Sequence, residues 1–280
     1  MRRVHLAEIE DQRWCPTSLR DAMTDFLRGA FHLLGQYRPA APLLAAILEE
    51  EGQSRLVDLG SGAGGPWPDL LFRLEALLPA GSDPVRVLLT DLYPNRRALE
   101  EIAERAPRRI EWDRRPVDAR HVPRELAGLR TLFTAFHHFE PDDARKILAD
   151  AVDAGQPVAV LEVTQRRFLA MLVLALGVAP LCLVLAPFLR PFRWSRLFWT
   201  YVLPLAPLAA AWDGLVSCLR SYRPSELREM AASAGGDDWT WTTREIAYWR
   251  GWSPVPVTAL IGRPPADRHQ SGGGSDGKGS

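Results

Sequence analysis

The sequence predicts an α/β protein in which a parallel β-sheet carries helices on both faces. Three observations support this fold class. Short apolar runs typical of buried strands alternate with segments of helical periodicity. A glycine-rich turn follows the first of these runs, and two edge-type strand patterns come late in the chain. Alternation of strands and helices is the pattern from which parallel sheets are built.

The elements follow one another in a regular order. Residues 17–50 carry two helical patterns that Pro39 and Pro42 separate, since proline ends or kinks a helix. The expected strands are 56–58, 85–91, a short one near 115–118, 129–136 and 157–163, and the expected helices between them are 70–78, 95–106 and 141–154. Two edge-type strands, 239–249 and 255–261, are joined by a predicted turn at 251–254.

The glycine-rich turn predicts a nucleotide-binding loop. An apolar run ends at Asp58, and the glycines that follow are Gly60, Gly62, Gly64 and Gly65. Glycine lets the backbone turn sharply and approach a ligand closely, because it has no Cβ. The spacing Asp-x-Gly-x-Gly-x-Gly differs from the dinucleotide-binding fingerprint Gly-x-Gly-x-x-Gly. It resembles the first motif of class I S-adenosylmethionine (SAM)-dependent methyltransferases.

That resemblance implies a Rossmann-like doubly wound sheet closed by an antiparallel strand pair, with SAM as the cofactor. In this family the position of Asp58 faces the methionine ammonium, an acid at the position of Asp91 accepts hydrogen bonds from the ribose diol, and Asp118 lies at the adenine edge. The residues alone also allow Asp91 to cap a helix or turn, and Asp118 to be a solvated turn residue. The residues expected to bind the cofactor are Asp58, Gly60, Ser61, Gly62, Gly64, Asp91, Leu92, Asp118, Ala119 and Thr134.

Two adjacent histidines, His137 and His138, follow the fourth expected strand at the sheet edge where ligands bind in open α/β sheets. If the chain is extended there, their side chains point to opposite sides and cannot act as a pair. His137 is the predicted general base for a substrate hydroxyl, and Glu162 is the second catalytic candidate. The alternatives are a structural histidine, and a Glu162 that pairs with Arg166 or Arg167.

A hydrophobic insertion separates the fifth strand from the closing pair. Residues 168–189 contain no charge, and a second apolar run, 197–212, contains two prolines. The first run is long enough to span a membrane. Both ends of the insertion must return to one sheet, which favours a hairpin that enters one leaflet, with the nearby arginines at the headgroups. The alternative is a soluble helical lid over an apolar substrate.

Composition narrows the possible functions. Lysines plus arginines and aspartates plus glutamates number 34 each, so the net charge gives no sign of nucleic-acid binding. Three isolated cysteines, Cys15, Cys182 and Cys218, fit a reducing compartment and argue against a metal site or disulfide framework. The acidic N-terminal segment lacks a signal-peptide core. We therefore expect a cytoplasmic enzyme, with the insertion as the only candidate for peripheral or monotopic contact with the inner face of the membrane.

These observations predict the following organisation: a helical cap at 1–50, a SAM-binding core at 51–164, the hydrophobic insertion at 165–222, a C-terminal helix with the closing strand pair at 223–264, and a disordered tail at 265–280. The predicted activity is SAM-dependent transfer of a methyl group to a heteroatom, most simply a hydroxyl oxygen, of an apolar small molecule or lipid. Two alternatives stay open: transfer of another group from a SAM-like donor, and a non-catalytic, membrane-tethered scaffold. The sequence sets no oligomeric state.

Overall fold

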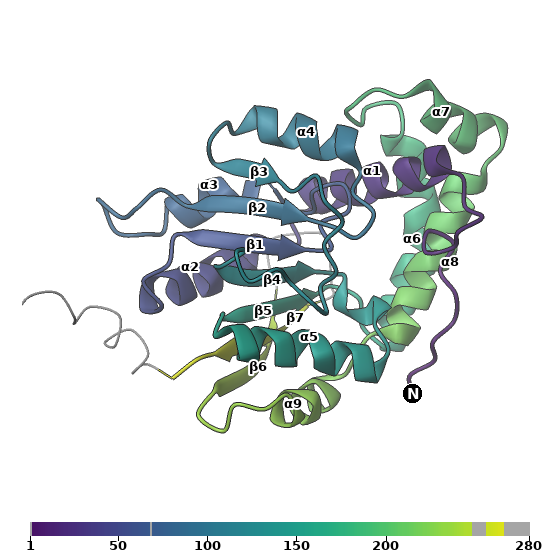
Figure 1. Cartoon of the computed structure of the whole chain (residues 1–280). Coiled ribbons are helices and arrows are strands. Elements are labelled where there is room, and N and C mark those ends of the chain that lie inside the picture. Colours follow the sequence, from purple (N-terminus) through teal and green to yellow (C-terminus); the bar gives the residue numbers. More distant parts are fainter. Residues whose placement is uncertain (1, 68, 248–255, 266–280) are drawn as a thin grey trace, which may run out of the picture.

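A seven-stranded sheet forms the centre of the computed structural model, which describes residues 2–67, 69–247 and 256–265 (Figure 1). The strands are β1 (Arg55–Leu59), β2 (Arg86–Thr90), β3 (Ile110–Trp112), β4 (Leu129–Phe133), β5 (Val158–Glu162), β6 (Thr240–Ile246) and β7 (Val257–Arg263). Their order across the sheet is β3-β2-β1-β4-β5-β7-β6. Strands β1 to β5 pair in parallel, and β7 pairs antiparallel with both β5 and β6.

Helices cover both faces of the sheet. The helices that follow the parallel strands are α3 (Asp69–Glu75), α4 (Arg96–Arg105) and α5 (Pro141–Ala154), and α2 (Ala41–Glu50) and α9 (Pro224–Ser233) complete the two layers. Helices α2, α3 and α4 pack on one apolar cluster, whereas α5 and α9 pack on the other. Neighbouring residues of β1, Leu56 and Val57, point into opposite clusters, as the two-residue period of a strand requires. The predicted doubly wound α/β sheet is therefore confirmed.

Two predicted strand boundaries are wrong. The short third strand lies at Ile110–Trp112 rather than near 115–118. Residues 113–118 instead run irregularly along the end of β2, because Pro116 has no amide to donate and the Asp113 carboxylate accepts the Arg115 amide in a turn. The fourth strand ends at Phe133, because Thr134 adopts a left-handed conformation with φ +47°. The predicted turn at 251–254 and the predicted tail from 266 onward lie outside the described residues.

The remaining helices lie beyond the carboxyl ends of the parallel strands (Figure 1). They are α1 (Thr17–Leu34), the short η1 (Arg38–Ala40), and four elements of the insertion: α6 (Phe168–Leu185), α7 (Trp194–Leu197), the π-helical η3 (Phe198–Val202) and α8 (Leu205–Arg220). Helices α6 and α8 pack against each other and both contact α1. Residues 2–16 form no helix or strand and run along this group; we call them the N-terminal strap.

Among the described residues, α6 is one helix that is long and apolar enough to cross a membrane. Its mean hydropathy is 2.8, and only 11% of it is buried within the protein. The bent pair formed by residues 194–202 and 205–220 meets the same criteria only if its two parts, which are inclined by 82°, are counted together. A helix that is apolar all round is normally covered on every side. In α6, by contrast, most of this apolar surface is not covered by the rest of the chain that the structure describes.

Candidate active site

Some glycines of the loop after β1 border open space, whereas others pack against neighbouring elements. Gly62 has φ +54°, its amide donates to Asp91 Oδ2 at 2.7 Å, and an added Cβ would meet no atom within 4 Å. Gly60 lies against the end of β4, where an added Cβ would be 3.2 Å from that of Ala135. Gly64, predicted to bind the cofactor, faces Ile102 of α4, which an added Cβ would strike at 2.1 Å. Gly64 therefore serves helix packing, and Gly62 borders the open space.

Asp58 holds the base of this loop. Its carboxylate accepts hydrogen bonds from Ser61 Oγ at 2.7 Å and Thr131 Oγ1 at 2.8 Å, and the residue is 1% exposed. Burial raises the pKa of Asp58 to about 7, against the opposing effect of these two hydroxyls. Ser61 was predicted to bind the cofactor. Its hydroxyl donates to Asp58 and accepts a hydrogen bond from the Thr90 amide, so both of these contacts lie within the protein. The contact of Asp58 with a methionine ammonium stays a prediction.

The second and third predicted acids differ in their surroundings. Asp91 follows β2 and accepts the amides of Gly62 and Tyr93, each at 2.7 Å, so its carboxylate shapes the loop as well as bordering it. Burial raises the pKa of Asp91. Asp118 accepts hydrogen bonds from the guanidinium and the backbone amide of Arg120, which lower its pKa. Next to these acids, Leu92 is exposed and Ala119 is buried. Cofactor contacts of all four stay predictions.

The two histidines lie on a short helical turn, η2 (Phe136–His138), and not on an extended strand. Their ring centres are 4.4 Å apart and both rings line the same cavity, so the prediction that they point to opposite sides is wrong. The physical reason is the left-handed Thr134, which turns the chain as it leaves β4. Thr134 itself lines the cavity, and its hydroxyl is hydrogen-bonded to Tyr37.

His137 is oriented by Glu162. The carboxylate Oε2 lies 2.7 Å from His137 Nδ1, and Oε1 accepts the backbone amides of Phe136 and His137 at 2.8 and 3.3 Å. A carboxylate only accepts, so this contact favours the tautomer with its proton on Nδ1. His137 Nε2 forms no hydrogen bond within the described residues and faces Glu8 Oε1 at 3.7 Å. In this tautomer Nε2 carries a lone pair that accepts no hydrogen bond from the described residues.

Glu162 does not pair with either arginine that the sequence suggested. Arg166 binds Glu226 of α9, and Arg167 binds Glu245 of β6. The Glu162 side chain instead turns inward from the end of β5 and is 95% buried. Its role toward His137 is that of a positioning residue.

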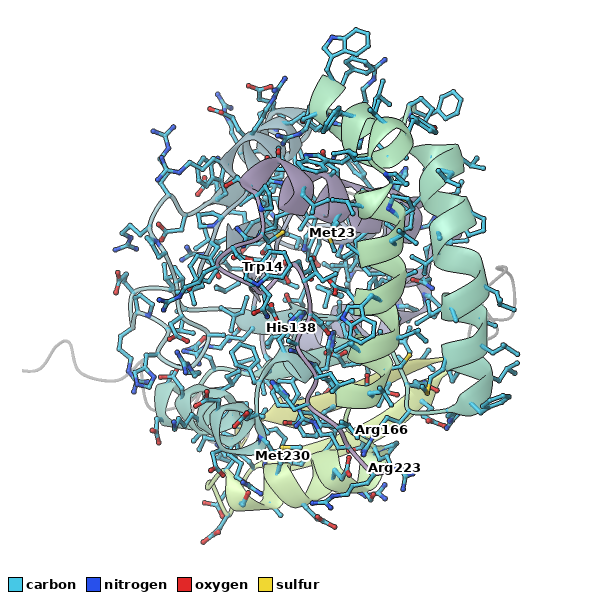
Figure 2. All side chains as sticks on the ribbon, turned by 90° about the vertical axis from the view of Figure 1, so that its right-hand side faces the viewer. Trp14, Met23, His138, Arg166, Arg223 and Met230 are labelled. Carbon is cyan, nitrogen blue, oxygen red and sulfur yellow. The ribbon has the colours of Figure 1, made fainter. Side chains whose placement is uncertain are left out.

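The N-terminal strap adds an acidic cluster that sequence reasoning missed. Figure 2 shows the strap, in purple, passing His138 on its way along α8. Glu8 of the strap is fully buried, and it binds His138 Nδ1 at 3.0 Å and Arg220 Nη1 at 3.1 Å. Although burial lowers it, the carboxylates of Glu8 and Asp11 together raise the pKa of His138 well above its ordinary value. The only sequence signal was the unusually acidic segment at 8–11.

Backbone contacts hold the strap in place. Arg3 donates to the carbonyl oxygens of Arg220 and Phe139 at 2.6 and 2.8 Å. The Trp212 indole donates to the carbonyl of Ala7 at 3.1 Å. These bonds join the strap to the end of η2 and to α8, so the acids of the strap have a defined position beside the histidines.

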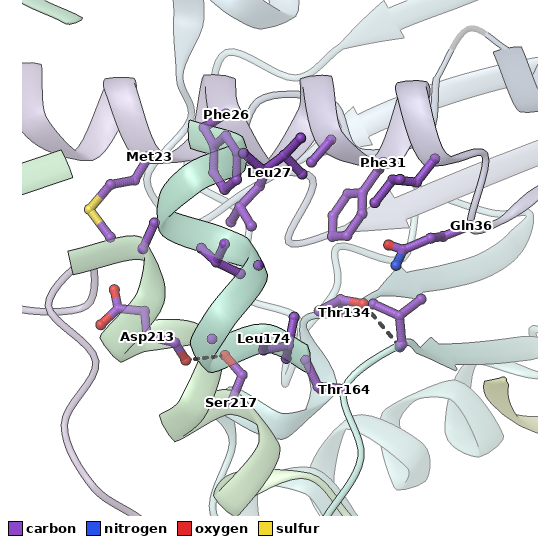
Figure 3. A pocket seen from close by; sticks show the side chains of 18 of the residues that line it. Met23, Phe26, Leu27, Phe31, Gln36, Thr134, Thr164, Leu174, Asp213 and Ser217 are labelled. Carbon is purple, nitrogen blue, oxygen red and sulfur yellow. Dashed lines mark hydrogen bonds between the residues drawn. The ribbon is translucent and has the colours of Figure 1, made fainter. Parts of the chain in front are cut away.

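A cavity of about 260 Å³ lies beside the two histidines. Apolar side chains of α1 and α6 form most of its wall, and labelled polar side chains such as Asp213, Ser217 and Thr134 lie across from the α1 residues (Figure 3). The apolar lining residues include Met23, Phe26, Leu27, Phe31, Val173, Leu174, Val178 and Leu181. The polar lining residues are Glu10, Gln36, Thr134, His137, His138, Thr164, Asp213 and Ser217. The cavity is therefore mostly apolar, with polar groups that include both histidines.

The strand order decides the fold family. Five parallel strands in the order β3-β2-β1-β4-β5, closed by the reversed β7 next to β5, are the arrangement that the sequence resemblance implied. The chain has the class I methyltransferase fold. In this fold the loop after β1 and the ends of β2 and β4 face the same edge, and this edge carries Gly62, Asp91 and His137.

Comparison with known proteins finds likeness in structure only. No protein-family model and no curated protein sequence matches the chain. Human N-acetylserotonin methyltransferase in complex with SAM matches at 13% identity and a TM-score of 0.48, over 89% of this chain and 56% of that one. The methyltransferase domain of bacterial CtHen1 matches at 13% identity and a TM-score of 0.47, over 82% of this chain and 99% of that one.

A third match is magnesium protoporphyrin IX methyltransferase from Synechocystis PCC 6803 with bound SAH. It is 9% identical, with a TM-score of 0.46, over 82% of this chain and 83% of that one. The chain spans 55% to 59% of the length of the methyltransferase SibL, the human enzyme and an O-methyltransferase family protein from Burkholderia thailandensis. At these identities the likeness concerns the fold.

Proposed function

We propose that this protein transfers a methyl group from SAM to a hydroxyl of an apolar acceptor. One observation carries the proposal: His137, held by Glu162, lines an apolar cavity at the edge that also carries the glycine loop, and its Nε2 has no hydrogen-bond partner within the described residues. The open space at Gly62 and the buried acid Asp91 beside it are consistent with the cofactor. The chain's own residues thus supply both a cradle and a base.

The proposed mechanism uses His137 as a general base. When bound, SAM supplies an electrophilic methyl on a sulfonium, and this carbon–sulfur bond breaks as the new carbon–oxygen bond forms. His137 Nε2 accepts the proton of the acceptor hydroxyl, while Glu162 stabilises the resulting imidazolium. The apolar walls from α1 and α6 exclude water and hold the acceptor near the base.

Methyl transfer can be tested directly with labelled SAM and matched acceptors. We expect label to pass to a medium-chain alcohol but not to its methyl ether, which has no proton for His137 to accept. Saturable SAM binding with no transfer to any hydroxyl compound would contradict the proposal and favour the non-catalytic scaffold. Transfer of a larger group from the donor, visible by mass, would favour the other alternative.

We also propose that the insertion docks on the lipid bilayer from which the acceptor enters. Large apolar side chains of the insertion form an exposed surface, here called the docking face: Phe168, Leu169, Leu172, Val173, Leu176, Leu183, Val184, Phe188, Phe192, Trp194, Phe198, Tyr201, Val202, Leu203, Leu205, Leu208 and Trp212. An apolar surface of this extent marks an interaction site. Removing it from water contributes roughly 25 cal/mol per Å².

Two of the three arginines in 190–196 that were predicted to meet the headgroups are engaged elsewhere, and the third, Arg190, is exposed. Arg196 is 1% exposed and binds Asp25 of α1 at 2.8 Å, and Arg193 binds Asp21 and Asp25 at 2.7 and 3.0 Å. These buried ion pairs fasten α7 to α1. Membrane docking should therefore depend on the apolar face and only weakly on the charge of the lipids.

Vesicle flotation tests the docking face. Wild type should float with phosphatidylcholine vesicles, and Leu176→Glu/Val184→Glu should abolish flotation, because it places two charges on the most exposed part of α6. The matched control is Phe72→Glu/Leu77→Glu, which changes exposed apolar residues in α3 and just after it, outside the insertion, and should float like wild type. Wild type that stays unbound and elutes as a dimer would assign the face to a second copy of the chain.

A further inference from the structure

The acids around the histidines fall into two groups according to their partners. Glu8 and Asp11 share two cations, since both contact His138 Nδ1, at 3.0 and 3.2 Å, and Arg220 Nη1, at 3.1 and 2.8 Å. Glu162 is satisfied by His137, two backbone amides and the Thr164 hydroxyl. These three carboxylates therefore have partners within the protein.

The other two acids, Glu10 and Asp213, line the cavity. Glu10 Oε2 is shielded from water and has no hydrogen-bond partner within the described residues, and the nearest cationic atom to its other oxygen is His138 Nε2 at 4.0 Å. Asp213 accepts the amides of Ile9 and Glu10 at 2.7 and 3.0 Å and forms no ion pair in the part of the chain that the structure describes. At the cavity wall, Asp213 thus has no cationic partner within the described residues, and the nearest cation to Glu10 is the His138 ring, 4.0 Å away.

Their acid–base behaviour agrees with this geometry. Burial raises the pKa of Glu10 to about 8 and that of Asp213 to about 6, because a carboxylate is unfavourable away from water; the attraction of His138 opposes this effect at Glu10 but is smaller. The charged groups that act on Glu10 are His138, Glu8, Asp213 and Asp11. His137, a second polar group at the same wall, is 1% exposed and also has an unpartnered nitrogen. An acidic oxygen of Glu10 and a ring nitrogen of His137 thus both have no hydrogen-bond partner within the described residues.

We propose that Glu10 and Asp213 bind the ammonium group of the acceptor, which is a lipophilic amine that also carries the hydroxyl presented to His137. A cation at this position supplies the partner that Glu10 lacks, and the apolar wall covers the hydrocarbon part. The ammonium is an anchor and not the methylated atom, because its nitrogen lone pair is protonated. This inference rests on the proposed function for the fate of the hydroxyl, whereas binding of the cation is independent of SAM.

Calorimetry with three eight-carbon probes tests the inference without SAM. At pH 9 Glu10 is ionised and octylamine is still largely protonated. Octylammonium should bind at least about 10-fold more tightly than octanol, and octanoate should bind most weakly, because charge complementarity separates molecules of equal apolar length. At pH 6 the preference for octylammonium should shrink, since Glu10 is then protonated. Equal affinity for octylammonium and octanol at pH 9 would overturn the inference.

Variants locate the binding. Glu10→Gln should lower the affinity for octylammonium about 10-fold and leave octanol within about 2-fold, and Asp213→Asn provides a second, independent test. Asp142→Asn, at an exposed acid of α5, is the matched control and should change neither. Gly177 lines the cavity with no atom within 4 Å of an added Cβ, so Gly177→Leu should block both probes by filling the space. Binding that survives Gly177→Leu would place the probe on the docking face and contradict the proposal.

The outcomes separate this inference from the proposed function. Octylammonium binding with no methyl transfer to any hydroxyl would leave the cation site in place and remove the methyltransferase proposal. Methyl transfer to neutral alcohols, together with no preference for octylammonium over octanol, would support the methyltransferase proposal and remove the cation site.

Discussion

Replacing His137 with alanine is expected to lower kcat by about 10²–10⁴-fold while SAM binding is retained. The reason is the loss of the nitrogen that accepts the hydroxyl proton, whereas the glycine loop lies on other elements. Single-turnover measurement of methyl transfer, with SAM affinity determined by calorimetry, separates the two effects. His32→Ala is the matched control, because His32 is exposed in the last turn of α1.

Glu162→Gln distinguishes a base from a merely structural histidine. An amide at this position can still bond to His137 but cannot stabilise an imidazolium by charge. We expect an intermediate loss in kcat and a changed dependence of kcat on pH, with KM for the acceptor nearly unchanged. Near-full turnover of His137→Ala with SAM bound would remove the base from the mechanism and leave positioning alone.

Gly62→Val is expected to abolish SAM binding. At φ +54° a β-branched residue is strained, by an amount on the order of 1–2 kcal/mol, and its side chain would project into the open space at the loop. Calorimetric titration with SAM should give no measurable heat of binding for the variant. The fold should persist, because an added Cβ meets no protein atom there.

The control for this variant is Gly81→Val. Gly81 also has a positive φ, +92°, with open space around it, but it lies on an exposed loop before β2. Its replacement should reproduce the backbone strain without touching the cofactor edge. If Gly62→Val takes up SAM as wild type does, the cofactor binds elsewhere.

Local patterns were sufficient to predict the sheet and the glycine loop. Strand β1 with its acid and glycines is encoded by contiguous residues, and so is helix α5 with Pro141 at its start. Local propensity and periodicity are therefore enough to predict both. The same reasoning failed at 134–138, where the left-handed Thr134 redirects both histidines. No local rule predicts that a threonine adopts this conformation, because its contacts with Tyr37 and β5 are tertiary.

The sequence predicted the site residues that follow the strands of the sheet, but not those on the N-terminal strap and α8. His137 and Glu162 were singled out because they end strands, but their contact depends on the pairing of β4 with β5. Glu8, Glu10, Asp213 and the other acids of the cluster were missed, since nothing in the sequence indicates which distant segments meet. The same holds for the arginines of the insertion, whose ion pairs with α1 become visible only in three dimensions.

The attachment of the strap to α8 has a consequence for biosynthesis. The bonds from Ile9 and Glu10 to Asp213 join residues that are 204 and 203 positions apart. Ribosomes add roughly 5–20 residues per second, so the strap waits on the order of 10–40 s for its binding surface to emerge. A nascent chain can form the strands of the glycine-loop half during that interval, but it has no acidic pocket. The acids of the strap therefore reach their place beside the histidines only late in translation, after α8 has been made.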